Sequence, residues 1–401
     1  MSTLYTGRLA AGSYVELNVI GKRIDSVREV EPAADSPWLF PVLVDLQHNG
    51  SMGVAYNELH DDVAGKLPRV ARHLRQHGVG RCWATLTTYP GDKLLCTAKA
   101  LDQWLSAHPD ENTLFTGIFH EGIFISPVAG WRGAHVPDWV RPPDIDYFHR
   151  IMEASGGRIR AVNVAPEQPG ALTFIEQVVA AGVQIALGHA GPDAATVATA
   201  VARGATLVTH FGNGAPPQIH RHRNPLWSYL AHPELCLGLI GDGFHLPPDL
   251  VRAALAAKTE RRCFLVSDAS GHAGMPPGTY RRAGGAEFVI TAEGYMHLVD
   301  SEILSGAWFQ LDAGVEFLVR HLGFDLPAAW RLCSQIPARI AGIDLPDLSA
   351  GSEASFVVAH WDDGLVLDQC VHGGEPYLAA PLRARAEGIH PPSRVESGYY
   401  G

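Results

Sequence analysis

The chain has 401 residues, 46% of them hydrophobic, and its 31 basic and 42 acidic side chains give a formal net charge of −11. This length corresponds to roughly two to three ordinary domains, although barrels often exceed that size as one domain. The acidic balance argues against a nucleic-acid or acidic-membrane surface, and no stretch is apolar for long enough to span a bilayer.

The cysteines and the N-terminus bear on the cellular compartment. None of the six cysteines forms a Cys-x-x-Cys pair, and several lie inside apolar runs, which is typical of reduced, buried thiols. The first residues contain no long apolar segment of the kind found in signal peptides. We therefore expect a cytoplasmic protein.

The first predicted elements along the chain are antiparallel strands. Residues 1–40 show alternating apolar and polar positions and a Gly-Lys turn. Short apolar runs then alternate with segments of helical periodicity, several of which stop at a glycine, as at Gly78, Gly182 and Gly204. The apolar runs lie near residues 42–46, 81–87, 113–119, 160–164, 183–187, 205–209, 235–240 and 262–267. Continuous apolar strands that alternate with helices predict a parallel sheet covered on both faces, and eight of them predict an α/β fold of the (β/α)8 TIM-like barrel type.

The last part of the chain returns to β-structure. Residues 286–299 predict a hairpin inserted near the end of the barrel, and residues 351–372 repeat the pattern of the N-terminal strands. We therefore predict a small β-sandwich domain formed by both termini, residues 1–41 plus 345–401, and a barrel formed by residues 42–344.

Four residues suited to metal chemistry lie at or just past the ends of apolar runs. Glu121, His189, His210 and Asp268 occur in the segments LFTGIFHEG, VQIALGHA, ATLVTHFGN and CFLVSDAS. The carboxyl ends of barrel strands meet at one rim, where active sites are built. A single histidine at such a position more often caps its strand, but four suitable residues together favour a site. One carboxylate and two imidazoles that leave a position open are a ligand set for catalytic zinc.

Two catalytic roles follow from position along the chain. Asp268 follows the eighth run and could take a proton from metal-bound water and give it to a leaving amine; the alternative is a turn cap, which is common in Asp-Ala-Ser sequences. His245 follows the seventh run and could donate a hydrogen bond to a substrate carbonyl. Asp242 is as near in sequence, but we assign it to the Gly-Asp-Gly turn.

The order and spacing of several short motifs form a known pattern. They are VDLQHNG (44–50), HEGIF (120–124), GAH (133–135), APE (165–167), GHA (188–190), THFGNGAP (209–216), DGFH (242–245), SDAS (267–270) and LSGA (304–307). Together they make the chain resemble the N-acetylglucosamine-6-phosphate deacetylase family of the amidohydrolase superfamily, as a divergent member. The resemblance covers nearly the whole chain. It implies a (β/α)8 barrel with a small β-domain, a homodimer, and deacetylation of an amino-sugar phosphate.

The resemblance also implies roles for individual residues. Glu121, His189 and His210 match the metal ligands, Asp268 the catalytic acid/base, and His245 the histidine that polarises the carbonyl. The positions expected to contact the substrate are His135, Asn213, Gly214 and Gln47.

The first strand predicts how many metal ions are bound. Gln47 and Asn49 fall where many amidohydrolases carry His-x-His, and neutral amides are poor zinc ligands beside imidazole. We therefore expect one divalent metal ion per chain, with zinc favoured and iron or manganese as alternatives. His48 should point to the opposite face of the strand and be a packed histidine.

The loops that read the substrate depart from the family pattern. Phe119-His120-Glu121-Gly122-Ile123 replaces His-Leu-Glu-Gly-Pro, and we expect His120 to face away from the site. Arg221 has the family's spacing for a phosphate-binding arginine, whereas Arg223 has its Arg-x-Pro context. A phosphate requires a fixed guanidinium or several amides, so the sequence leaves both arginines open, beside the alternative of a solvated basic loop.

These observations predict a mononuclear metal-dependent hydrolase that acts on a small-molecule N-acyl amide. The favoured substrate is N-acetylglucosamine-6-phosphate or a related amino sugar. One alternative is a different amide, a cyclic amide or a lactone, and the other is a catalytically silent binding protein with the same fold. The Gly- and Pro-rich loop 271–285, after the eighth run, is expected to cover part of the site.

Overall fold

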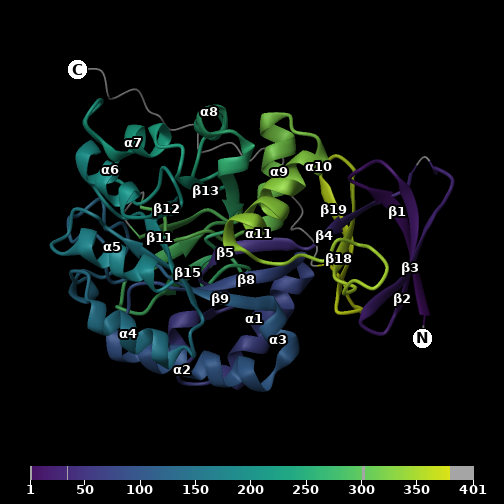
Figure 1. Ribbon diagram of the computed structural model, residues 1–401, viewed down its shortest axis with the longest axis horizontal. Helices are drawn as coiled ribbons and strands as arrows, with labels where there is room; N and C mark the ends of the chain where they lie inside the picture. The colour runs from purple at the N-terminus through teal and green to yellow at the C-terminus, as the bar shows by residue number, and fades with distance from the viewer. Residues whose placement is uncertain (1, 34, 300–302, 380–401) are drawn as a thin grey trace.

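The computed structural model describes residues 2–33, 35–299 and 303–379, which form a large helix-covered barrel with a smaller β-lobe at one end of the long axis (Figure 1). Residues 380–401, which we assigned to the small domain, lie outside the described residues. Within the described residues, no helix is long and apolar enough to cross a membrane.

The barrel consists of eight parallel strands that pair in chain order. They are β5 (Leu43–His48), β8 (Val79–Leu86), β9 (Phe115–His120), β10 (Ile159–Val164), β11 (Gln184–Leu187), β12 (Ala205–Val208), β13 (Cys236–Ile240) and β14 (Cys263–Val266). Backbone hydrogen bonds close the ring, because Asp268 N donates to Gln47 O at 2.9 Å and Asn49 N donates to Ala269 O at 2.9 Å. The predicted (β/α)8 barrel is confirmed.

Helices cover the outside of the barrel. They are α1 (Val63–Gln76), α2 (Gly91–Ala107), α3 (Pro109–Leu114), α4 (Ile145–Ala154), α5 (Ala171–Ala180), α6 (Ala194–Ala202), α7 (Pro225–Ala231), α8 (Pro248–Lys258), α9 (Leu311–Leu322), α10 (Leu326–Cys333) and α11 (Gln335–Ala341), with 3-10 turns η1 (Tyr56–Glu58), η2 (Pro137–Trp139) and η3 (Glu260–Arg262). Gly78, Gly182 and Gly204 follow α1, α5 and α6 with φ of +74°, +78° and +102°, so the predicted stops at these glycines are confirmed.

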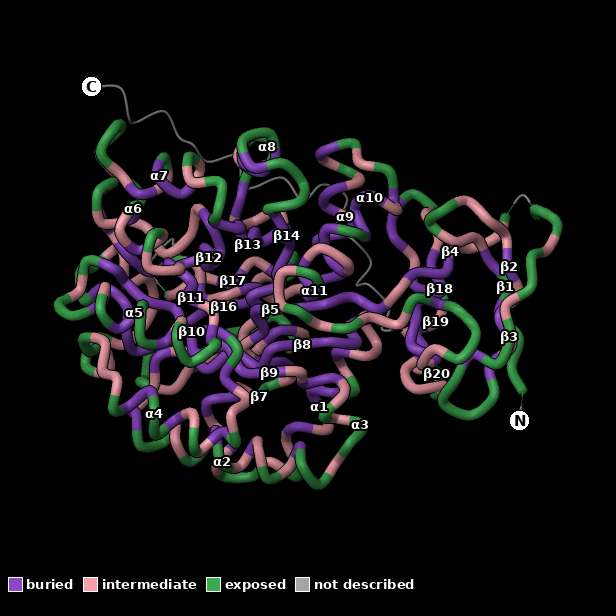
Figure 2. Tube along the Cα trace, viewed as in Figure 1, coloured by how far each residue is buried: buried purple, intermediate pink, exposed green. Residues whose placement is uncertain are grey.

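The core lies in two layers on either side of the strands. Side chains inside the barrel, such as Trp83, Phe119 and Phe264, pack with Ala338 of α11. Side chains on the outer faces pack against the helices, and most residues of the barrel strands are buried in Figure 2. Burial on both faces explains why the strands are continuously apolar, and it leaves only their ends free for polar groups.

The small lobe is one seven-stranded sheet, in the order β20-β19-β18-β4-β1-β2-β3. Its strands are β1 (Ser2–Leu9), β2 (Tyr14–Ile20), β3 (Arg23–Glu29), β4 (Trp38–Pro41), β18 (Phe356–Trp361), β19 (Leu365–His372) and β20 (Glu375–Tyr377). Leu17 and Ile24 from the N-terminal strands share one apolar cluster with Phe356 and Val371 from the C-terminal strands. The two halves therefore enclose a common core, and the sandwich built from both termini is confirmed.

A three-stranded antiparallel sheet follows the eighth barrel strand. It contains β15 (Gly278–Arg281), β16 (Glu287–Ile290) and β17 (Met296–Leu298). The last two strands form the hairpin predicted for residues 286–299. The strand β15 was not predicted, because it lies within the segment that we read as a loop. A short ribbon of β6 (Gly50–Ser51) and β7 (Val54–Ala55) follows the first barrel strand.

Candidate active site

The carboxyl ends of four barrel strands bring the predicted residues to one rim. Glu121 directly follows β9, and His189, His210 and Asp268 each stand two residues after β11, β12 and β14. The last three have φ of +49°, +29° and +49°, in the left-handed region that residues other than glycine rarely adopt. Such backbone conformations cost about 1–3 kcal/mol each and cluster at functional sites.

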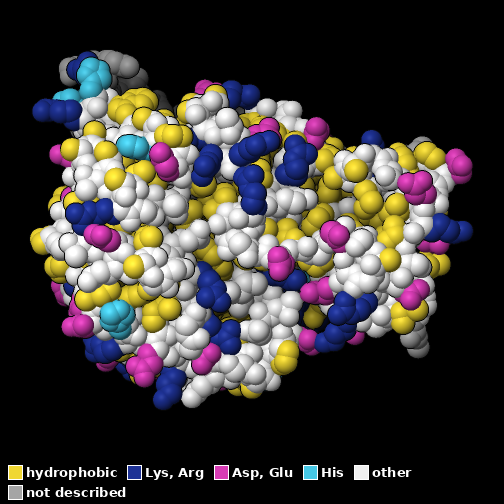
Figure 3. Space-filling model, viewed as in Figure 1, with side chains coloured by type: hydrophobic (Ala, Val, Ile, Leu, Met, Phe, Trp, Pro, Cys, Tyr) yellow, Lys and Arg dark blue, Asp and Glu magenta, His cyan; other side chains and the backbone are white. Residues whose placement is uncertain are grey.

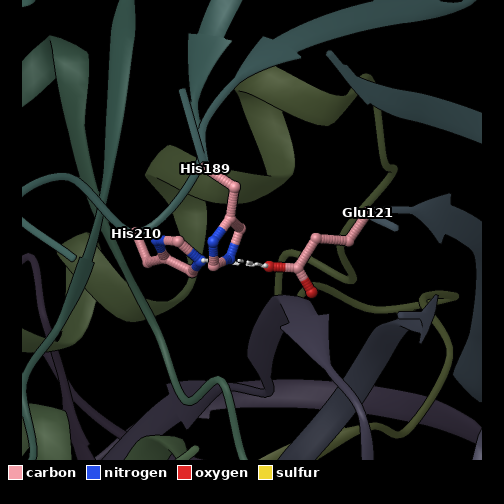
Figure 4. A group of neighbouring side chains, drawn as sticks. All are labelled: Glu121, His189 and His210. Atoms are coloured by element: carbon pink, nitrogen blue, oxygen red, sulfur yellow. Dashed lines mark hydrogen bonds and ion pairs between the residues drawn. The ribbon is translucent and has the colours of Figure 1, made fainter. Parts of the chain in front are cut away.

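Three side chains converge at the centre of this rim. Glu121 Oε1 lies 3.0 Å from His210 Nε2 and 3.5 Å from His189 Nε2, and the two Nε2 atoms are 2.9 Å apart. Figure 4 shows the carboxylate and both rings pointing toward one another. All three residues are buried, at 2%, 7% and 3% exposure for Glu121, His189 and His210. We call them the ligand triad.

The ligand triad fits a divalent cation. Two ring nitrogens that face each other at 2.9 Å can share only one proton, whereas a cation accepts a lone pair from each. One carboxylate and two imidazoles also leave coordination positions open, as catalytic zinc sites require. Burial raises the pKa of Glu121, but the hydrogen bonds with His189 and His210 outweigh it and hold this pKa well below its ordinary value.

The ring of His189 is held on two sides. Its Nδ1 lies 3.1 Å from the backbone oxygen of Trp131, which fixes its orientation. Gly214 packs directly against the ring, because a Cβ at this position would lie 2.8 Å from Nδ1. Gly214, which we expected to contact the substrate, therefore leaves room for a ligand-triad histidine, and its φ of +60° also favours glycine.

Two amides hold Asp268 by one carboxylate oxygen. Asp268 Oδ1 accepts hydrogen bonds from Asn49 Nδ2 at 2.8 Å and Gln47 Nε2 at 3.2 Å. Gln47 Nε2 also donates to Glu121 Oε1 at 2.9 Å, so Gln47 lies between the two carboxylates. Burial and the charge of Glu121 raise the pKa of Asp268 above its ordinary value, which favours a group that takes up and returns a proton.

His245 forms a buried pair with Asp242. Asp242 Oδ1 accepts the backbone N–H groups of Phe244 and His245, both at 2.9 Å, which is the turn role that we assigned. Asp242 Oδ2 also lies 2.7 Å from His245 Nδ1, a contact that the sequence reading missed. Burial lowers the pKa of His245, but the charge of Asp242 outweighs it and raises this pKa above its ordinary value. The Asp-x-x-His spacing of Asp242 and His245 was the sequence signal from which this contact could have been predicted.

His135 and Asn213 lie beside the ligand triad. His135 Nε2 is 3.2 Å from His189 Nε2, with the two rings edge to face. Burial and the nearby charge of His189 hold the pKa of His135 well below its ordinary value. The backbone N–H of Asn213 donates to His210 O at 2.9 Å, and among the described residues its buried Nδ2 has no hydrogen-bond partner. Both side chains are therefore placed where a ligand could meet them.

The two arginines of the basic loop stand apart. Arg221 and Arg223 are exposed, and no hydrogen bond or ion pair joins either of them to the ligand triad in the described part of the chain. Arg223 Nε instead lies 3.4 Å from Nε2 of His220. Positive and negative side chains are interspersed on the face shown in Figure 3.

Two further histidines turn away from the site, as expected. His48 is buried, and its ring nitrogens lie 2.8 Å from Tyr56 Oη and 3.1 Å from Gln310 Oε1. His120 packs against the rings of Phe124 and Tyr147.

Comparison with known proteins finds deacetylases of amino-sugar phosphates among the relatives, although no family model matches. The chain is 30% identical to N-acetylglucosamine-6-phosphate deacetylase of Bos taurus over 365 residues, which cover 88% of this chain and 85% of that protein. It is 30% identical to N-acetylgalactosamine-6-phosphate deacetylase of Escherichia coli O157:H7 over 338 residues, which cover 84% and 86%. The solved N-acetyl-D-glucosamine-6-phosphate deacetylase of Mycobacterium smegmatis superposes with a TM-score of 0.82 at 27% identity, over 93% of this chain and 99% of that one.

Proposed function

Because this chain belongs to the N-acetylglucosamine-6-phosphate deacetylase family of the amidohydrolase superfamily, we propose that it removes the acetyl group from an N-acetylated hexosamine 6-phosphate. The observation that carries the proposal is the convergence of Glu121, His189 and His210 beside Asp268 at one barrel rim. A metal-dependent hydrolase of carbon–nitrogen bonds uses this combination of metal ligands and a proton-transfer group.

The named relatives limit the substrate. One acts on a glucosamine derivative and one on a galactosamine derivative, and both substrates are N-acetylated and carry a 6-phosphate. These two sugars differ only in configuration at C4. We propose the glucosamine derivative as the substrate, with the galactosamine derivative as the nearest alternative. A cytoplasmic homodimer is part of the same proposal.

Glu121, His189 and His210 would hold one divalent ion, for which zinc is the proposed identity. When bound, such an ion lowers the pKa of a water molecule and polarises the amide carbonyl. Asp268 accepts the proton of the attacking water and delivers it to the leaving nitrogen. Asn49 and Gln47 occupy Oδ1 of Asp268, so Oδ2 is the atom that carries the proton.

His245 and His135 complete the proposed chemistry. His245 donates a hydrogen bond to the substrate oxygen on which negative charge develops, while Asp242 holds its other ring nitrogen. His135 stands beside His189 and contacts the substrate in the position next to the ligand triad.

Metal analysis paired with amine release from N-acetylglucosamine-6-phosphate, N-acetylgalactosamine-6-phosphate and unphosphorylated N-acetylglucosamine tests the proposal. We expect about one metal ion per chain, given one ligand triad, and a preference for a phosphorylated sugar. Metal without turnover of any of the three would reject the substrate class but keep the hydrolase chemistry. A neutral N-acyl amide is the second candidate, and the exposure of Arg221 and Arg223 favours it.

A further inference from the structure

Asn163 is a buried polar residue that we did not single out from the sequence. It is the second-to-last residue of β10 and has 0% exposure. It lies on the same face of the strand as Ala161, which belongs to the apolar cluster inside the barrel, whereas Val162 and Val164 pack on the outer side. The Asn163 side chain therefore points into the barrel, nearer than Ala161 to the rim that carries the ligand triad.

The Asn163 amide joins the ends of the two strands that follow β10 in the sheet. Asn163 Nδ2 donates to Gly188 O at 3.1 Å, and Thr209 Oγ1 donates to Asn163 Oδ1 at 2.7 Å. Gly188 and Thr209 are the first residues after β11 and β12, so they stand directly before His189 and His210. One side chain is thus hydrogen-bonded to the residue before each histidine of the ligand triad.

One orientation of the Asn163 amide satisfies both partners. A backbone oxygen can only accept, so Gly188 O requires the N–H group of the amide, and the amide oxygen then faces Thr209. The hydroxyl of Thr209 is therefore the donor of the second bond. The space is equally constrained, because a Cβ on Gly188 would lie 2.6 Å from Cβ of Thr209 and 2.9 Å from Oδ1 of Asn163.

Both histidines of the ligand triad depend on their backbones for direction. Their φ angles are positive, at +49° for His189 and +29° for His210, and such conformations persist only where the surroundings fix them. The ring of His189 is also held through Nδ1 by Trp131 O. Nδ1 of His210 forms no hydrogen bond with another described residue. Support for this ring from outside the ligand triad therefore comes through packing and through its backbone, which Thr209 precedes.

We propose that Asn163 is a positioning residue for the metal site, because its amide fixes the strand ends that aim His189 and His210 at one cation. The inference deepens the proposed function and rests on its metal site, but not on the identity of the sugar. Histidines that bind metals are usually oriented by a hydrogen bond to the second ring nitrogen. For His210, Asn163 supplies this support through Thr209 and the backbone, and the same amide also holds the residue before His189.

Zinc affinity, measured by competition with a chromogenic chelator, tests this role in Asn163→Ala and Thr209→Val. Loss of a partner that orients a metal ligand lowers metal affinity by roughly 10- to 100-fold, and we expect a loss in this range for both variants. The variant Thr209→Val is nearly isosteric, so it tests the bond even if Asn163→Ala does not fold. The variant Thr209→Ser keeps the donating hydroxyl, and its zinc affinity should stay close to that of the unaltered protein.

The matched control is Thr97→Val on α2. It removes another buried threonine hydroxyl that donates to a backbone oxygen, Asn57 O at 2.9 Å. Urea unfolding of the metal-free proteins is measured in parallel. We expect Thr97→Val to lose stability as Thr209→Val does, yet to keep the zinc affinity of the unaltered protein. A loss of affinity in Thr209→Ser as large as that in Thr209→Val would overturn the inference, because the hydroxyl would then not orient the site.

The inference and the proposed function can fail separately. If the unaltered protein binds zinc but turns over none of the three sugars, the proposed substrate fails, while the zinc affinities of the variants still test Asn163. Equal zinc affinities in Asn163→Ala, Thr209→Val and Thr97→Val would overturn the inference and leave the substrate unaffected. An unaltered protein that binds none of zinc, iron and manganese would overturn both.

Discussion

Replacing Asp242 with Asn tests whether this carboxylate sets the charge of His245. The two side chains are 6% and 5% exposed and lie 2.7 Å apart, so solvent screens their interaction little. The variant Asp242→Asn keeps an Oδ1 that can accept the backbone N–H groups of Phe244 and His245. The turn should therefore persist while the negative charge is lost.

The size of the effect follows from the contact. A hydrogen bond between charged groups contributes about 1.5–3 kcal/mol, and 1.36 kcal/mol corresponds to about one pKa unit. The charge of Asp242 raises the pKa of His245, so its removal should lower that pKa. The imidazolium then loses its proton at a lower pH. If the protonated ring assists the reaction, the alkaline limb of the kcat/KM profile should move to lower pH.

The assay is kcat/KM measured across the pH range for the unaltered enzyme, Asp242→Asn and a control, Asp249→Asn, which alters an exposed aspartate in the first turn of α8. Metal content is measured on the same samples. An unchanged alkaline limb in Asp242→Asn, with normal metal content, would show that Asp242 does not set the charge of His245. A uniform loss of activity at every pH would show that Asp242 supports only the turn.

Three further predictions address the site and its surroundings. Asp268→Asn should keep fold and metal but lose kcat by roughly 10²–10⁴-fold, because an amide cannot carry the proton; near-normal turnover would contradict this role. His189→Ala should bind less metal, since it removes one of three ligands, and unchanged metal content by elemental analysis would count against the ligand triad. Burial lowers the pKa of His120 to about 4, so below pH ~6.5 the unfolded chain takes up this proton first and stability falls by about 1.4 kcal/mol per pH unit. The variant His120→Leu lacks this contribution. Between pH 6.5 and 5 its free energy of unfolding, measured with urea, should fall by about 2 kcal/mol less than that of the unaltered protein. An equal fall in both proteins would contradict this role of His120.

The barrel could be predicted from sequence because its strands are buried on both faces. Each strand is then a short apolar run, and each helix end at Gly78, Gly182 and Gly204 carries a local backbone signal. The strand β15 lacked any such signal. Its residues Gly278–Arg281 are mostly exposed, and it is defined by pairing with β16, a contact that only the folded chain provides.

The residue types at the candidate site could be predicted from the ends of the strands. The hydrogen bonds that these side chains form with their neighbours could not. Contact between Gln47 and the substrate stays a prediction, and sequence spacing did not indicate that Gln47 donates to Glu121 and Asp268. Asp242 was assigned only to its turn, although its second oxygen faces His245. Both residues lie close in sequence to the end of a barrel strand. Their contacts depend on the direction in which each side chain points among its neighbours at the rim of the barrel. Sequence spacing does not specify that direction.

The strained residues support the interpretation of this rim as a site rather than a set of strand caps. His189, His210 and Asp268 have positive φ, at a combined cost on the order of 3–9 kcal/mol, which is comparable to the whole stability of many domains. A residue that only capped a strand could relieve this cost by becoming glycine or asparagine. The strain persists because neighbouring strands fix the backbone, as when Asp268 N donates to Gln47 O and Thr209 N donates to Leu187 O. The fold thus holds these three side chains in directions that the strands alone would not give them.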